Sequence, residues 1–339
     1  ATHYHLTRRE ASGSVSILSP EDLSPERGSA TAFSDVVAQV PGLIAQDRHN
    51  LALGERIMMR GLGWRSAFGI RGIRILQNGI PLTMPDGQTI SSIIEPASVS
   101  HVQVIRGPAS GYWGNGSNGV IYLDVFPSDK APALSWRHTA GSFQLQKSVL
   151  QWNVRAEGRR IRGYVSAMSM DGYRRHNSTK VIRLGSQAEL YDSESNSVDL
   201  TVALLSKPQA QHPGSLDRTA VRNDRKQARQ SFVQSDAGEK AFQGQTGIRW
   251  RFSGDQLRFE STLYGIRRDL ENRLPFGFIT LDRRAGGSRS TAHFQLAEHW
   301  QLSTGWDVSL QSDDRLERSN KDGEPGDQVY VDQLETVWN

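Results

Sequence analysis

The chain has 339 residues, of which 40 are Lys or Arg and 36 are Asp or Glu, so its formal net charge is only +4. That balance is too even to predict a nucleic-acid partner, and the length favours two domains or one very large architecture. The absence of cysteine excludes disulfides and thiolate metal sites.

The first third of the chain combines one short helix with short strands. Apolar residues recur at helical spacing from Phe33 to Val40, which predicts an amphipathic helix over residues 31–40 that ends at Pro41-Gly42. Asn78-Gly79 is the strongest hairpin signal, because both residues tolerate positive φ. Short β runs are predicted at Ile73 to Leu76, Val102 to Ile105 and Val120 to Val125.

Long Gly-rich connections between these strands carry side chains that suit a ligand. Small rigid strands presenting elaborate loops are typical of a binding surface rather than of a packed enzyme core. Aromatic and thioether groups could pack on a flat or apolar ligand, and polar groups offer charge and hydrogen bonds. Ordinary loop packing explains each residue equally well. The candidate ligand-binding residues are Trp64, Arg65, Ser66, Phe68, Met84, Asp86 and Gln88.

Motifs for catalysis or nucleotide binding are weak. Residues 114–119 spell G-x-G-x-x-G, but the residues after Gly119 predict a strand, whereas a dinucleotide site needs a helix there. The sequence has no G-x-S-x-G elbow and no H-E-x-x-H motif. Asp313-Asp314 is predicted to lie in a loop as solvated charge. An enzyme, a metal site and a covalently bound cofactor are therefore not predicted.

From Ala133 onward apolar and polar residues alternate. The run from Trp300 to Gln311 has a period of two, and its length matches the ~9–11 residues of a tilted transmembrane strand. Tryptophans near run ends suggest interfacial girdles, although a soluble β-sandwich would also alternate. About ten strands are expected in all. Other runs cover Leu145 to Ala156, Arg160 to Met170, Val181 to Leu190, Asn196 to Leu205, Gly247 to Ser253, Leu257 to Ile266 and Ser290 to Ala297.

The connections between these runs are unequal, as a transmembrane barrel requires. Gly158-Arg159 and Gly254-Asp255 predict tight turns at the periplasmic rim, whereas residues 206–243 form a long polar stretch that suits an extracellular loop. Basic residues there are interleaved with Asp217 and Asp224. This pattern predicts first a solvated loop and second an anion-attracting surface.

Several separate motifs follow one another in the first third of the chain. They are Pro41-Gly42 after a helix, Arg60-Gly61, Asn78-Gly79-Ile80-Pro81, Val104-Ile105-Arg106-Gly107-Pro108, and Tyr112-Trp113-Gly114 followed by Gly119-Val120-Ile121. Their order and spacing resemble the plug domain of the TonB-dependent outer-membrane receptors. The resemblance implies an α+β plug, a small mixed sheet with short helices, followed by antiparallel transmembrane β-barrel strands. The expected boundaries are 1–10 for an N-terminal segment, 11–130 for the plug and 131–339 for the N-terminal part of the barrel.

The resemblance also assigns roles to residues. Plugged barrels of this type have 22 strands, so the barrel in this chain is expected to be incomplete. In the family, arginines at the positions of Arg60 and Arg106 latch the plug to barrel glutamates, which are expected beyond Asn339; a surface arginine is the alternative. The ligand candidates fall on the family's outward-facing plug apices. The place of the TonB box is taken by Thr2, His3, Tyr4, His5 and Leu6, for which a disordered terminus is the alternative.

The resemblance predicts a receptor in outer-membrane lipid that imports a scarce small molecule by plug gating, driven by the TonB partner. The stretches GLGWRSAFGIRGIR and GIPLTMPDGQ are especially similar to the subgroup that imports pyrroloquinoline quinone, a planar tricarboxylate. A ferric-siderophore receptor is the alternative cargo class. A signalling receptor would carry a further small domain before the plug. A soluble β-rich binding protein, with its tryptophans in an apolar core, is the alternative from another class.

Overall fold

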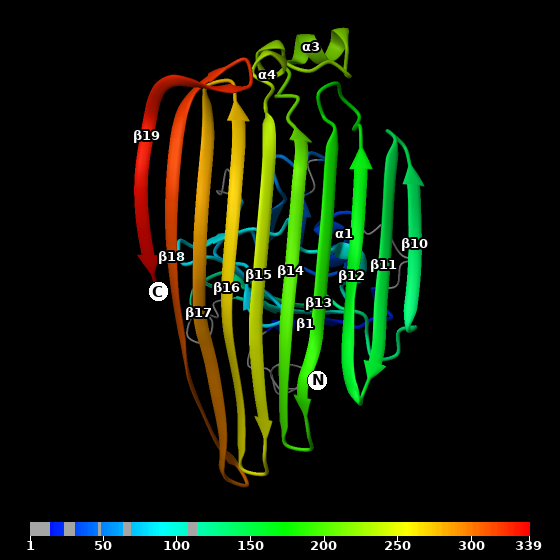
Figure 1. The fold of residues 1–339 in the computed structure, drawn as a ribbon, viewed down its shortest axis with the longest axis vertical. Coiled ribbons are helices and arrows are strands. Elements are labelled where there is room, and N and C mark those ends of the chain that lie inside the picture. The colour runs from blue at the N-terminus through cyan, green and yellow to red at the C-terminus, as the bar shows by residue number, and fades with distance from the viewer. Residues whose placement is uncertain (1–13, 24–30, 47–48, 64–68, 108–113, 115) are drawn as a thin grey trace.

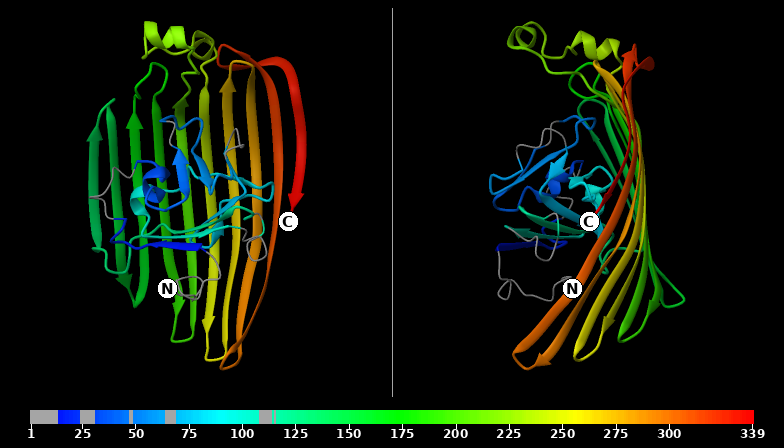
Figure 2. Two further views of the ribbon diagram at one scale, coloured as in Figure 1. Left: turned by 180° about the vertical axis from the view of Figure 1, so that it is seen from behind. Right: turned by 90° about the vertical axis from the view of Figure 1, so that its left-hand side faces the viewer.

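The computed structural model describes residues 14–23, 31–46, 49–63, 69–107, 114 and 116–339. A small mixed domain, residues 14–126, lies against the concave face of a tall curved sheet, residues 134–338 (Figures 1 and 2). We call these two parts the plug and the wall. No helix in the described ranges is long and apolar enough to cross a membrane.

The plug is built on a five-stranded sheet with the order β1-β8-β9-β5-β6. Strands β5 and β9 run parallel, and the other neighbours run antiparallel. Two smaller pairs, β2 with β3 and β4 with β7, complete the strands of the plug. The bounds are β1 (Ser14–Leu18), α1 (Phe33–Val37), β2 (Leu43–Gln46), β3 (Arg56–Met59), β4 (Ile70–Arg71), β5 (Ile73–Gln77), β6 (Ile80–Pro81), β7 (Gln88–Thr89), the 3-10 helix η2 (Pro96–Ser98), β8 (His101–Arg106) and β9 (Gly119–Asp124).

The main hydrophobic core of the plug continues into the wall. It joins the buried faces of α1, β5, β8 and β9 to four wall residues: Tyr164, Val181, Ala203 and Leu205. The apolar helix face predicted from Phe33 to Val40 is buried in this core, but α1 is shorter than the predicted residues 31–40. Asp35 accepts hydrogen bonds from the backbone N–H groups of Thr31 and Ala32, so the helix begins only after them.

Two predictions on glycine-containing segments are confirmed. Asn78 and Gly79 have φ values of 52° and 89° and reverse β5 into β6, as the hairpin signal predicts. The Asn78 side chain also accepts a hydrogen bond from Val125 N at 2.9 Å. The G-x-G-x-x-G segment leads into strand β9 rather than into a helix. At Gly119 the φ is 146°, and a Cβ atom there would collide with Met59.

The wall is a ten-stranded antiparallel sheet in which the strands pair in sequence order from β10 to β19. The expected number of strands and their antiparallel order are confirmed. The sheet is not closed, because β10 and β19 are its two ends. The bounds are β10 (Leu134–Gly141), β11 (Leu145–Ala156), β12 (Arg159–Met170), β13 (Thr179–Asp192), β14 (Asn196–Gln211), β15 (Gly238–Ser253), β16 (Leu257–Leu274), β17 (Gly277–Ala297), β18 (Trp300–Lys321) and β19 (Glu324–Trp338).

The two faces of the wall have opposite polarity. On β18, Trp300 and Trp306 are 73% and 55% exposed on the convex face, whereas Gln311 and Asp313 are buried on the concave face. A soluble fold that hid its tryptophans in an apolar core would have the reverse arrangement. The convex face of the wall is therefore apolar and suited to lipid, and the concave face is polar, as in a transmembrane barrel.

Several wall strands extend beyond the predicted runs. Many outward residues in these extensions are charged, as at Asp282, Arg284 and Asp314, so the apolar alternation that marks a strand is weaker there. For the same reason the prediction of a loop at Asp313-Asp314 is wrong. Both residues lie in β18, and Asp313 is buried and paired with Arg283 rather than solvated.

The connections divide between the two ends of the wall as predicted. Tight turns follow β11 and β15, with positive φ at Glu157 and Gly158 in the first, and both lie at the end opposite α3 and α4 (Figure 1). The long loop is narrower than the predicted residues 206–243, because β14 and β15 extend into it from both sides. It spans residues 212–237 and contains α3 (Arg218–Asn223) and α4 (Gln230–Gln234).

Candidate functional site

The predicted plug apex at residues 81–89 lies toward the wall end that carries the long loop 212–237. Its Asp86 contacts Arg283, which lies in the part of β17 nearest the β16–β17 turn, and that turn is at the α3 and α4 end (Figure 1). The other candidates, Trp64, Arg65, Ser66 and Phe68 of the first apex and the N-terminal Thr2, His3, Tyr4, His5 and Leu6, lie outside the described residues.

The apex at residues 84–88 is a tight turn that its own residues hold in shape. Gly87 N donates to Met84 O, and Met84 N donates to Gln88 O, each at 2.8 Å. The Asp86 carboxylate accepts from Gln88 N at 2.8 Å, and Arg71 Nη1 donates to Asp86 O at 2.8 Å. A Pro-Asp-Gly sequence favours such a turn. The apex therefore presents Asp86 in a defined position.

The described ligand candidates differ in accessibility. Met84 is only 1% exposed and packs with Ile80 and with Tyr264 and Ile266 of β16, so its side chain fixes the apex to the wall. Gln88 is half-buried in β7, and Asp86 is half-buried beside Arg283. Asp86 and Gln88 are thus the described candidates whose polar groups remain partly open.

Arg283 joins the apex to two wall strands. Its Nη2 lies 3.0 Å from Asp86 Oδ2 in the plug and 2.6 Å from Asp313 Oδ2 on β18. Its Nε donates to Asp313 Oδ1 at 2.8 Å. A second buried cation, Arg268, stands directly opposite Arg283 on β16 and donates to Gln243 at 3.1 Å. The inner wall beside the apex is thus rich in guanidinium groups that carboxylates and amides bind.

The two arginines predicted to latch the plug make contacts within the plug. Arg106 Nη1 donates to the carbonyl of Pro41. Arg60 is exposed, has a left-handed φ of 50°, and its backbone N–H donates to Gly42 O at 2.9 Å. Their pairing with barrel glutamates in later strands stays a prediction.

Other charged residues tie the plug to the described wall. Arg74 of β5 pairs with Asp307 of β18 at 2.6 Å. Glu95, which also caps η2 through Ala97 N, pairs with Lys147 Nζ at 2.6 Å. Two further wall residues contact the Glu95 carboxylate. Ser166 Oγ of β12 donates to Glu95 Oε2 at 2.5 Å, and Arg183 Nη1 of β13 lies 3.5 Å from the same oxygen. Besides Asp86, the plug therefore supplies Arg74 and Glu95 to ion pairs on the inner face of the wall.

The pKa of Glu95 reflects two opposed effects. Complete burial raises the pKa of this carboxyl group, but the charges of Lys147 and Arg183, with hydrogen bonds from Lys147 and Ser166, outweigh burial and leave the pKa below its usual range. Glu95 is accordingly ionised at neutral pH in the middle of the plug–wall contact. We call Glu95, Lys147, Ser166 and Arg183 the Glu95 cluster.

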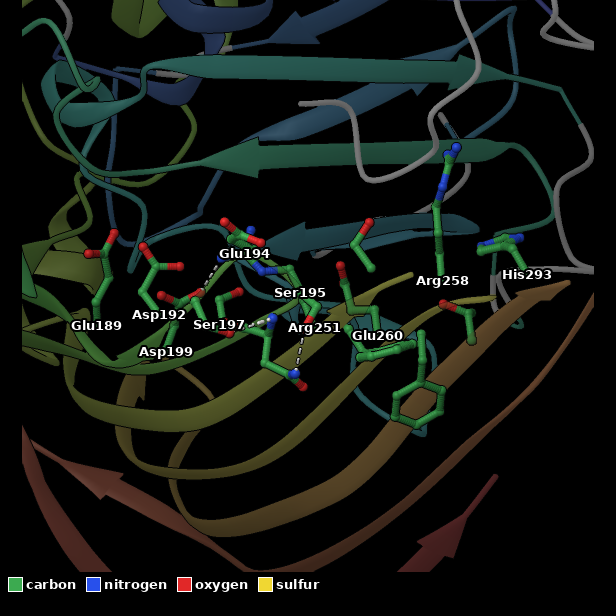
Figure 3. Close-up of a pocket in the computed structure, with 16 residues that line it drawn as sticks. Glu189, Asp192, Glu194, Ser195, Ser197, Asp199, Arg251, Arg258, Glu260 and His293 are labelled. Atoms are coloured by element: carbon green, nitrogen blue, oxygen red, sulfur yellow. Dashed lines mark hydrogen bonds and ion pairs between the residues drawn. The ribbon is translucent and has the colours of Figure 1, made fainter. Parts of the chain in front are cut away.

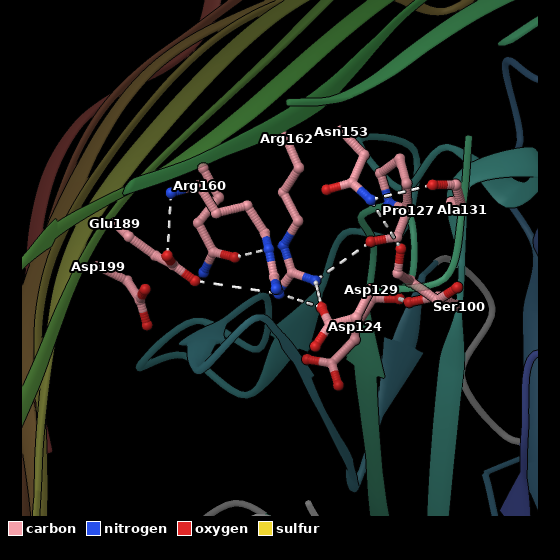
Figure 4. A network of polar contacts seen from close by, with 12 residues as sticks. Ser100, Asp124, Pro127, Asp129, Ala131, Asn153, Arg160, Arg162, Glu189 and Asp199 are labelled. Carbon is pink, nitrogen blue, oxygen red and sulfur yellow. Dashed lines mark hydrogen bonds and ion pairs between the residues drawn. The ribbon is translucent and has the colours of Figure 1, made fainter. Parts of the chain in front are cut away.

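A third polar network anchors the segment that leads from plug to wall (Figure 4). Arg162 Nη1 donates to Pro127 O at 3.1 Å and lies 3.5 Å from Asp129, which also pairs with Arg160. Asn153 donates to the carbonyls of two further residues of this segment at 3.2 Å. Residues 127–131 are thus bound to β11 and β12 at the end opposite the apex.

A hollow of about 340 Å³ lies on the inner wall near the short turns (Figure 3). Asp199, at its edge, pairs with Arg251 at 2.7 Å and with Arg249 at 3.3 Å, and Glu260 and Arg258 add charges of both signs. Among the described residues no three His, Asp or Glu side chains converge as a metal site requires. The hollow is a mixed-charge surface on the side of the plug away from the apex.

Sequence reasoning missed the residues that connect plug and wall. Sequence patterns assign no role to Arg74, Glu95 or Arg283, and they predict a loop at Asp313. Arg283 and Asp313 occupy inward positions of alternating strands. Extending the period-two pattern to residues before Ser290 and beyond Gln311 places them on the inner face. The pairing of Arg74 with Asp307, 233 residues apart, leaves no local signal.

Comparison with known proteins supports the plug-and-wall reading. Residues 7–121 match the family model described as TonB-dependent Receptor Plug Domain. A hemin receptor of Yersinia pestis is 30% identical over 113 residues, which are 32% of this chain and 15% of that receptor. The chain thus spans a small part of the curated relatives that it matches.

Solved structures share the fold over nearly the whole chain. The ferric citrate transporter FecA in its unliganded form superposes with a TM-score of 0.75 at 16% identity, over 97% of this chain and 52% of FecA. The ferric yersiniabactin uptake receptor FyuA from Yersinia pestis gives 0.74 at 12% identity, over 96% and 52%. The predicted fold and outer-membrane location agree with these comparisons. Residues 7–121 are therefore similar to the plug domain of TonB-dependent receptors, and nearly the whole chain has the fold seen in 52% of the FecA and FyuA structures.

Proposed function

We propose that the protein is a TonB-dependent receptor that imports an iron chelate or a hemin-type molecule across the outer membrane. The observation that carries this proposal is the position of the plug. It lies on the polar concave face of a wall whose convex face is apolar, and its Asp86 apex faces the end with the long loop. A ligand arriving from that end meets the face of the plug that includes this apex.

The cargo class rests on relatives and on local chemistry. Two curated relatives that match part of this chain are hemin receptors, and FecA and FyuA take ferric citrate and ferric yersiniabactin. Buried arginines such as Arg268 and Arg283 beside the apex suit anionic groups on such chelates. The resemblance of residues 61–74 and 79–88 to pyrroloquinoline quinone importers makes this planar tricarboxylate the second candidate.

The proposed mechanism is gating without chemistry in this chain. Ligand binds the plug apices, and TonB pulls on the N-terminal segment at residues 2–6 so that the plug rearranges and opens a passage. Arg74, Asp86 and Glu95 form ion pairs with the wall. A rearrangement of the plug relative to the wall would break some of these pairs. Outer-membrane lipid is the expected environment of the convex face.

Uptake measurements test this function. Cells that depend on the protein are supplied with iron as hemin, ferric citrate or a ferric siderophore, or with pyrroloquinoline quinone. Their uptake of each cargo is compared with that of cells whose protein lacks residues 1–10. Uptake of one cargo that is lost in the truncated form is the expected result. Equal uptake with and without residues 1–10 would argue against TonB coupling. No dependence of any cargo on the protein would reject the import function.

A further inference from the structure

We propose that Arg283 is a carboxylate-exchange site, at which a carboxylate of the incoming ligand replaces Asp86 and thereby frees the plug apex from the wall. This inference rests on the proposed import function and narrows the cargo to molecules that carry a free carboxylate. It also makes the Asp86–Arg283 contact the point at which binding of cargo is communicated to the plug.

The guanidinium of Arg283 has one edge filled and one edge half used. A guanidinium can hold a carboxylate through two parallel hydrogen bonds on either of its edges. Asp313 fills the Nε and Nη2 edge, at 2.8 and 2.6 Å. Asp86 reaches the other edge through Nη2 alone, at 3.0 Å. The buried Nη1 has no hydrogen-bond partner among the residues described.

Asp86 cannot use the second edge fully without losing its own turn. Its Oδ2 faces Arg283, while its Oδ1 accepts the hydrogen bond from Gln88 N at 2.8 Å that closes the apex. Turning both oxygens toward Arg283 would break that bond. A ligand carboxylate has no such constraint, so it can satisfy Nη1 and Nη2 together where Asp86 satisfies only one.

The other carboxylate on Arg283 is held more firmly. Asp313 is on a strand, its side chain is 9% exposed, and it also accepts from Gln311 Nε2 at 2.9 Å. Asp86 is on a turn and its side chain is 21% exposed. An entering anion therefore displaces Asp86 and leaves Asp313 in place.

Release of Asp86 has a local consequence for the plug. The apex then keeps its apolar tie through Met84 to β16 but loses its ion pair to β17. Binding of a carboxylate ligand thus removes one of the charged contacts that join plug and wall and leaves the Glu95 cluster intact. A cargo without a carboxylate would leave the Asp86–Arg283 contact closed.

The test compares acids with their esters on the protein extracted from outer membranes in detergent. Hemin and its dimethyl ester, and pyrroloquinoline quinone and its trimethyl ester, are titrated against the wild type, Asp86→Asn and Asp129→Asn. Asn at position 86 keeps the oxygen that accepts from Gln88 N but offers no carboxylate to Arg283. Asp129 is a matched control, because it also pairs with wall arginines but lies in the segment between plug and wall, at the end opposite the apex.

The expected result is that the wild type binds an acid more tightly than its ester. Asp86→Asn should bind that acid more tightly again, on the order of 10-fold, because the competing carboxylate is gone, and should leave ester binding unchanged. Asp129→Asn should change neither. Equal binding of acid and ester, or an Asp86→Asn variant that affects both alike or neither, would overturn the exchange while leaving the import function standing. Failure of both hemin and pyrroloquinoline quinone to bind the wild type would also overturn the exchange, whereas uptake of another ferric chelate that depends on residues 1–10 would still support the import function.

Discussion

Two of the charged contacts between plug and wall differ in depth. In the Glu95 cluster, the side chains of Glu95 and Lys147 are 0% and 2% exposed. At the apex, Asp86 keeps 21% of its side chain exposed beside Arg283. A buried pair is costly to break because the partner left behind is an uncompensated charge, whereas a partly exposed pair has water as a substitute partner. The first contact is suited to hold the plug, and the second is suited to be exchanged.

The packing around the two contacts follows the same division. The Glu95 cluster adjoins the continuous core that includes Tyr164 and Val181 of the wall, so the plug and strands β12 to β14 share one apolar interior. The apex has a separate, smaller cluster around Met84 and Tyr264. Breaking the first contact therefore disturbs the main core, and breaking the second disturbs only the apex.

Glu95→Ala should have the largest effect on how firmly the plug is held. Truncation leaves Lys147 and Arg183 buried without their carboxylate, which costs about 3–5 kcal/mol. Native-state hydrogen exchange of the β8 and β9 amides reports this loss as reduced protection. Glu95→Gln, which keeps the shape and some hydrogen bonds, should lose less. Unchanged protection in Glu95→Ala would mean that the cluster does not hold the plug.

Met84→Ala should have an intermediate effect confined to the apex. Met84 is buried against Ile80, Tyr264 and Ile266, and the truncation of a buried Met costs about 2–5 kcal/mol, with the lower end expected in so small a cluster. Hydrogen exchange should rise at residues 83–90 and stay as in the wild type at β8 and β9. Loss of protection across both regions would show that the apex is not separate from the main core.

Acidification should weaken the Glu95 cluster in a defined direction. Because the pKa of Glu95 is lower in the fold than its ordinary value of about 4.3 in an unfolded chain, its ionisation stabilises the fold fully above that value. The contribution is lost as the pH falls from about 4.3 through the lowered pKa of Glu95. The difference in protection between the wild type and Glu95→Gln should therefore shrink on acidification and stay constant from pH 6 to about pH 8. If the difference in protection does not change with pH, the charge of Glu95 is not what stabilises the cluster.

The sequence predicted the local geometry of both parts well. The Asn78-Gly79 reversal, the strand after Gly119 and the alternation from Trp300 to Gln311 all depend on neighbouring residues, and the structure has each of them. The predicted strand ends are less accurate where the convex face changes from apolar to charged residues, as at Asp314. The period-two pattern identifies a strand only while one of its faces is apolar.

A single sequence does not predict the contacts between plug and wall. Glu95 and Lys147 are 52 residues apart, and Asp86 and Arg283 are 197 apart, so nothing near either residue specifies its partner. The predicted apex did include Asp86, because Gly-rich loops between short strands mark exposed turns. No local pattern predicts that Met84, two residues away, packs against the wall instead of facing the ligand side.

Asp86→Asn should have the smallest effect on stability, although it has a large expected effect on ligand binding. The turn keeps its hydrogen bond from Gln88 N, Met84 still packs on β16, and Arg283 still has both oxygens of Asp313. Loss of a partly exposed pair costs about 0–1 kcal/mol. Urea unfolding midpoints of the variant and the wild type should differ little. If Asp86→Asn destabilised the plug as much as Glu95→Ala, both contacts would be structural anchors, and the apex would have no exchangeable tie through which bound cargo could act on the plug.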